Sequence, residues 1–169
     1  VESFRHHPAL LAWYISEEPA GHGVTPEELE AAAAIVRQLD PYHPVTIFVN
    51  PGASARYAGA MDLAMTDPYP TPDTPSGDVA GAVRTVRDAV APRVPLWLVP
   101  QAFGGNQWWS REPTATELRL MTWLGIVEGA TGMQYFIRHG LGGFPRSPDT
   151  WAAAWRDGAD VVVAIVNTQ

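Results

Sequence analysis

Short apolar runs alternate with longer helical patterns along this chain, and this alternation constrains the fold more than any other feature of the sequence. Apolar runs that end at turn residues predict buried strands, and apolar residues spaced three and four apart predict helices. Strands that alternate with helices form βα units around a parallel sheet. The sequence therefore predicts an α/β fold, with strands at 10–15, 45–49, 61–66, 95–99 and 132–137.

The helix after the first strand has a clear start signal. Thr25 is the expected N-cap, Pro26 takes the first helical position, and Glu28 completes a capping box. Apolar residues then recur on one face as far as residue 39, so we expect an amphipathic helix that covers the sheet.

Two further helices are predicted, at 79–90 and at 115–127. Thr114 and Glu117 have the spacing of a capping box at the start of the second one. Because this helix is apolar nearly all round, we expect it to be well buried, with Trp123 in the core.

The chain is predicted to consist of a barrel segment at 1–145 and a C-terminal part at 146–169. In the C-terminal part we expect a short helix near Trp151–Trp155, followed by an apolar run at 161–166. This part either closes the barrel or begins a following β-rich domain.

Composition excludes several functions. The net charge of −7 and the scattered arginines argue against a nucleic-acid partner. No apolar stretch approaches the roughly 18 residues of a membrane span, so no membrane association is expected. The chain has no cysteine and no metal-ligand spacing, so we expect neither a metal nor another cofactor.

Polar and aromatic residues follow every predicted strand. In parallel sheets and barrels, functional groups collect at the carboxyl ends of the strands. Polar loops are common at strand ends, but sugars suit this lining because hydroxyls need hydrogen bonds and C–H faces pack on aromatic rings. The candidate residues for a carbohydrate site are Glu17, Glu18, Asn50, Asp67, Tyr69, Gln101, Phe103, Trp108, Trp109, Tyr135 and His139.

The sharpest local signal is the pair of glutamates followed by Pro19. Two adjacent carboxylates after a buried strand repel each other, which favours protonation of one of them. A carboxyl group that keeps its proton near neutrality is what a general acid needs at a glycosidic oxygen. The alternative is that both glutamates are solvated in a loop and the proline only ends the strand.

The segment Trp13-Tyr14-Ile15-Ser16-Glu17-Glu18-Pro19 resembles the fourth-strand motif of the retaining glycosidases with (β/α)8 barrels. In that superfamily the Glu before Pro is the acid/base, so the resemblance implies this role for Glu18. Glu17 stands where the superfamily has an Asn or Asp. Residues 67–70, 101–104 and 129–132 are also similar to bacterial glycoside-hydrolase-like barrels. The resemblance implies that the five strands are barrel strands four to eight of a TIM-type barrel, and it favours a secreted or periplasmic enzyme.

The sequence departs from the superfamily at Gln101, where the seventh strand would carry a nucleophilic Glu. An amide cannot attack an anomeric carbon. Asp67 is the preferred second carboxylate, although an Asp before Pro is also a common turn residue. Glu17, or a residue outside this chain, could serve instead. The remaining hypothesis is a protein that binds carbohydrate without cleaving it.

The leading interpretation is a glycoside hydrolase that cleaves an oligo- or polysaccharide, and the alternatives are a non-catalytic carbohydrate-binding protein and a structural domain without a ligand. A complete barrel needs about 250 residues, and this chain has 169. An open barrel segment would expose sheet edges and apolar surface. We therefore expect it to associate with a missing N-terminal half of the barrel or with a second copy.

Overall fold

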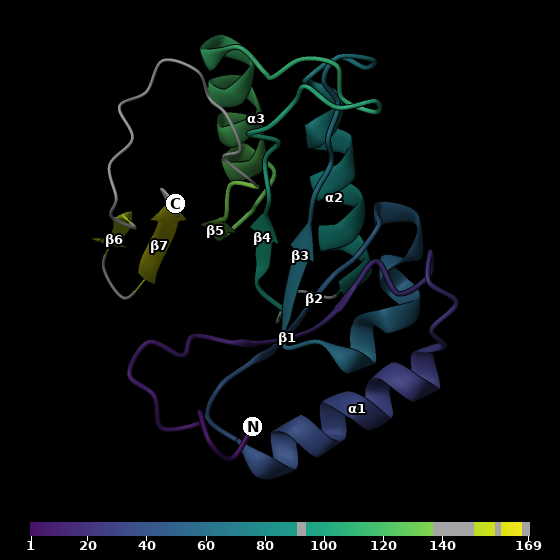
Figure 1. Ribbon diagram of the computed structural model, residues 1–169, viewed down its shortest axis with the longest axis vertical. Coiled ribbons are helices and arrows are strands. Elements are labelled where there is room, and N and C mark those ends of the chain that lie inside the picture. The colour runs from purple at the N-terminus through teal and green to yellow at the C-terminus, as the bar shows by residue number, and fades with distance from the viewer. Residues whose placement is uncertain (91–93, 137–150, 158–159, 167–169) are drawn as a thin grey trace. The chain divides into compact units, whose positions relative to one another are not determined.

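The computed structural model describes residues 1–90, 94–136, 151–157 and 160–166. Five parallel strands, β1 to β5, follow the order of the sequence and alternate with helices (Figure 1). This confirms the predicted α/β class and is consistent with part of a barrel. The chain divides into two compact units, one comprising 1–66 and 85–96 and the other 67–84 and 97–169.

The first unit contains the strands β1 (Trp13–Glu17), β2 (Val45–Phe48) and β3 (Leu63–Thr66), which pair in parallel. All residues of β2 and β3 are buried, as their apolar runs predict. The prediction that β1 is a buried strand is wrong, because Tyr14 is 49% exposed. This strand lies at the edge of the sheet, so it has a neighbouring strand on one side only.

Helix α1 (Pro26–Leu39) connects β1 to β2 and begins as the sequence predicts. The Glu28 amide donates to Thr25 Oγ1 at 3.2 Å, and the Thr25 amide donates to Glu28 Oε2 at 2.9 Å. The connection from β2 to β3 is η1 (Pro51–Ala60), a 3₁₀ helix that the sequence did not predict. It packs against α1 (Figure 1).

A buried carboxylate, Asp40, fixes the chain where α1 ends. Trp13 Nε1 donates to Asp40 Oδ2 at 2.9 Å, the Tyr42 amide donates to Oδ1 at 3.0 Å, and His43 Nδ1 lies 2.7 Å from Oδ2. Burial by itself raises the pKa of Asp40, but these hydrogen bonds outweigh it and lower the pKa to about 2. The histidine before the second strand, His43, therefore has a structural role.

The second unit contains β5 (Gly132–Met133), which pairs in parallel with β4 (Leu96–Leu98). Helix α2 (Asp78–Val90) precedes β4 and continues into the first unit, and α3 (Ala115–Val127) joins β4 to β5. Both helices lie where the sequence predicted them.

The chain continues as an antiparallel hairpin of β6 (Trp151–Asp157) and β7 (Asp160–Val166). Strand β7 pairs with β5. The prediction of a helix near Trp151 is wrong, because the backbone there is extended and pairs with the following apolar run.

Helix α3 begins with the predicted capping box of Thr114 and Glu117, but its expected burial is wrong. Gly125 is buried and lies so close to Leu98 that an added Cβ would overlap that side chain. Trp123 is 63% exposed. A helix that is apolar all round still packs through one stripe only, and Trp123 lies outside that stripe.

Candidate functional site

Glu18 has the most unusual backbone among the candidate residues that the structure describes. It follows β1 directly and takes a positive φ of 38°, in the left-handed region. That conformation costs a residue with a side chain about 1–2 kcal/mol. The amide of Glu18 donates to the carbonyl of Phe48 in β2 at 3.1 Å, and its carbonyl accepts from Gly21 at 2.9 Å. The turn is therefore held on both sides, and backbone strain of this kind is common at functional sites.

The structure brings Glu18 together with Asn50, another predicted site residue. Asn50 follows β2, and its Nδ2 donates to Glu18 Oε1 at 2.7 Å. Both side chains are partly buried, whereas Glu17 is exposed. The two neighbouring glutamates therefore differ: Glu18 accepts a hydrogen bond from Asn50 at the strand ends, and Glu17 is exposed to solvent.

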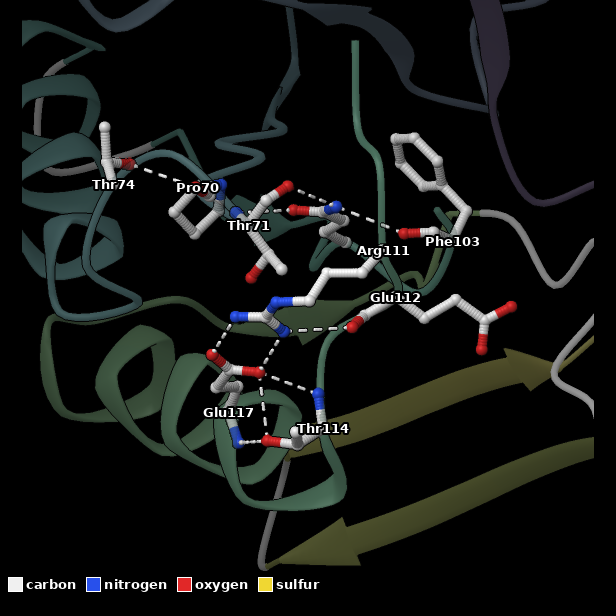
Figure 2. A network of polar contacts seen from close by, with 9 residues as sticks. Pro70, Thr71, Thr74, Phe103, Arg111, Glu112, Thr114 and Glu117 are labelled. Atoms are coloured by element: carbon white, nitrogen blue, oxygen red, sulfur yellow. Dashed lines mark hydrogen bonds and ion pairs between the residues drawn. The ribbon is translucent and has the colours of Figure 1, made fainter. Parts of the chain in front are cut away.

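Gln101, where a nucleophilic Glu was expected, has its side chain fully buried in the second unit. Its Nε2 donates to the carbonyls of Thr71 and Phe103 at 2.9 and 3.1 Å, and its Oε1 accepts from the Thr71 amide at 2.9 Å (Figure 2). Both amide hydrogens are therefore used inside the protein. The side chain holds the loop after β3 against the segment after β4, and it offers no donor to a ligand.

Four aromatic rings form a cluster around the ends of β3, β4 and β5. Centroid distances between neighbouring rings range from 5.0 Å to 6.0 Å, most with edge-to-face geometry. One tryptophan is also anchored by its indole, because Trp109 Nε1 donates to the Tyr69 carbonyl at 3.1 Å. The members of this aromatic cluster are Tyr69, Phe103, Trp109 and Phe136.

Phe136 was not among the predicted residues, and Tyr135 was chosen in its place. Tyr135 instead faces α3, where its hydroxyl lies 2.9 Å from Thr122 Oγ1. Phe136 makes the ring contacts, and its backbone bridges to Gln101. Adjacent residues of an extended chain point to opposite faces, so only one of Tyr135 and Phe136 can join the cluster, and the alternation by itself does not say which.

The remaining candidates lie in different places. Asp67 directly follows β3, is partly buried and belongs to the second unit, whereas Glu18 belongs to the first. Trp108 precedes the anchored Trp109 but is 69% exposed. His139 lies outside the described residues.

A second carboxyl group, that of Glu117, also has a lowered pKa, and the cause is again structural. Hydrogen bonds from Arg111 and then from the Thr114 amide lower the pKa of Glu117 to about 2. Figure 2 shows this glutamate joined to Arg111 and Thr114 at the start of α3. Its charge therefore stabilises a helix start and the loop before it.

Neither a metal centre nor a membrane helix is found in the described ranges. No group of three or more His, Asp or Glu side chains there is arranged to hold a metal ion. No helix in that part of the chain has the length and apolar character needed to cross a membrane.

The fold and the strand-end residues define a parallel α/β domain, with a Glu18–Asn50 pair in one unit and an aromatic cluster in the other. Comparisons of the chain with protein families, with curated proteins and with solved structures find no match.

Proposed function

We propose that this domain acts on carbohydrate as part of a glycoside-hydrolase-type barrel, with Glu18 as the proton donor to the glycosidic oxygen. The observation that carries this proposal is the 2.7 Å hydrogen bond from Asn50 Nδ2 to Glu18 Oε1 at the carboxyl ends of β1 and β2. The segment from Trp13 to Pro19, which resembles the acid/base motif of retaining glycosidases, supports the same role.

The pair is suited to acid catalysis. An amide that donates to one carboxyl oxygen fixes the orientation of the group and leaves the other oxygen to carry the proton. In the proposed reaction Glu18 protonates the leaving oxygen, and in a retaining mechanism the same group later activates water. The second carboxylate stays a prediction: Asp67 follows β3 and belongs to the other unit.

A panel of aryl glycosides tests the proposal. We expect the unchanged protein to hydrolyse at least one of them and Glu18→Gln to lose most of that activity. Glu17→Gln is the matched control, because Glu17 is the adjacent, exposed glutamate. Full activity of Glu18→Gln would remove Glu18 from the mechanism, and an equal loss in both variants would show that Glu17 is needed as well.

A second candidate function is carbohydrate binding without cleavage, and the position of Gln101 favours it. The residue expected to be the nucleophile is a buried amide that bonds to two backbone carbonyls. Titration calorimetry with linear oligosaccharides separates the two functions. Binding by a protein that hydrolyses none of the aryl glycosides would support this second function.

The expected association with other barrel strands stays a prediction. Strand β1 is at the edge of the sheet; Tyr14 within it is 49% exposed, and Leu11 just before it is 43% exposed. We propose that this edge pairs with another chain or copy, which light scattering tests. A stable monodisperse monomer would contradict it.

A further inference from the structure

Trp108 lies in a loop whose ends are pinned together. Gly104 lies directly against the backbone of Arg111 and Glu112, so closely that an added Cβ would overlap it. Arg111 is in turn held by Glu117 through two hydrogen bonds of 2.8 Å (Figure 2). Residues 104–112 therefore form a closed loop attached to the start of α3.

The tip of this loop is ordered by one side chain. Asn106 Oδ1 accepts from the amides of Trp108 and Trp109 at 2.9 and 2.8 Å. The Asn106 amide donates to the Trp109 carbonyl at 3.1 Å. The backbone donors of both tryptophans are therefore satisfied within the loop, which orders the backbone there without help from a ligand.

The two tryptophans have different roles as a result. Trp109 is part of the aromatic cluster, contacting Phe103 at 5.1 Å and Tyr69 at 5.7 Å between ring centroids. It anchors the loop. Trp108 is 69% exposed, so a large apolar ring is displayed to solvent on a backbone that is already ordered. Displaying it costs hydrophobic free energy that folding does not recover.

We infer that Trp108 is a stacking platform for one pyranose ring of an extended saccharide, and that Trp109 is only its structural support. This rests on the proposed function, because carbohydrate is taken as the ligand. A flat, exposed ring offers a face to the C–H side of a sugar, while the hydroxyls at the sugar's edge remain in water. Because the loop is ordered in advance, little conformational entropy is lost on binding.

The test is titration of linear hexasaccharides (cellohexaose, xylohexaose and maltohexaose) in a Glu18→Gln background, so that no ligand is consumed. We expect Trp108→Ala to weaken binding of the preferred hexasaccharide about tenfold, the scale of one aromatic stacking contact. Trp108→Phe should recover part of the loss, because it restores an aromatic face.

Trp123→Ala is the matched control. Trp123 is exposed to a similar extent, 63%, but lies on α3 rather than on the loop, so its removal should leave binding unchanged. Equal affinity of Trp108→Ala and the parent protein would overturn the platform while leaving the proposed function standing. Absence of binding by the parent, together with no hydrolysis by the unchanged protein, would overturn both.

Discussion

Gln101 and Thr71 are joined by two hydrogen bonds of 2.9 Å, in which the side-chain amide pairs with both the N–H and the carbonyl of one residue. This pairing needs a group that donates and accepts at once. A carboxylate accepts only, so it would satisfy the Thr71 N–H but turn its other oxygen toward the carbonyls of Thr71 and Phe103. These hydrogen bonds therefore require an amide at a position where a nucleophilic glutamate was expected.

Gln101→Glu should destabilise the protein by about 3 kcal/mol at neutral pH, because it buries a charge against carbonyl oxygens. The loss should shrink as the pH falls, since a protonated carboxyl can again donate one hydrogen bond. Urea unfolding at pH 7 and pH 4 measures both effects. Gln107→Glu, at an exposed glutamine, should change little. Similar stability of the two variants would show that the buried pairing contributes nothing.

Because Glu18 has a positive φ, glycine and alanine variants should rank in opposite orders of stability at Glu18 and at Glu17. Glycine adopts the left-handed region without penalty, so Glu18→Gly should be more stable than Glu18→Ala by about 1 kcal/mol. At Glu17, in the extended strand β1, the order should reverse by about 0.5–1 kcal/mol. Thermal unfolding of the four variants tests this. The same order at both positions would mean that Glu18 is not strained in solution.

Local features of the fold could be predicted from the sequence. The capping boxes at Thr25 and Thr114 involve residues three apart, and the strands are contiguous apolar runs, so both are visible in short windows. The candidate residues at strand ends followed from these positions, because parallel strands end at the same edge of the sheet.

Features that depend on distant parts of the chain could not be predicted. The partner of Gln101 lies 30 positions away, and nothing near either residue indicates the pairing. The exposure of Tyr14 and Trp123 depends on what covers them, which an apolar pattern does not specify. The hydrogen bond from Asn50 to Glu18 spans 32 positions, so both residues were predicted but their contact was not.

Asp40 should make stability depend on pH in the acid range. Its folded pKa is lowered from 3.8 to about 2, so the folded state binds protons less readily than the unfolded chain. The stabilisation is therefore present above pH 4 and is lost as the pH falls toward 2. Asp40→Asn should be less stable than the unchanged protein at pH 6, and the difference should narrow at pH 2.

Denaturant unfolding across this pH range measures the effect of Asp40. Asp73→Asn is the control, because it makes the same substitution at an exposed position in the loop before α2. A constant difference between Asp40→Asn and the unchanged protein from pH 6 to pH 2 would contradict the structural role assigned to this carboxylate.

The hydrogen bond from Asn50 to Glu18 should affect catalysis more than substrate binding. On the aryl glycoside that the protein cleaves best, Asn50→Ala should lower kcat about tenfold with a smaller change in KM, because Glu18 loses the donor that orients it. Asn50→Asp should not restore the activity, since a carboxylate at this position cannot donate the hydrogen bond that the Asn50 amide gives to Glu18. Gln38→Ala removes an exposed amide from α1 and should keep full activity. If Asn50→Ala lowered only substrate affinity, Asn50 would contact the sugar itself and would not act through Glu18.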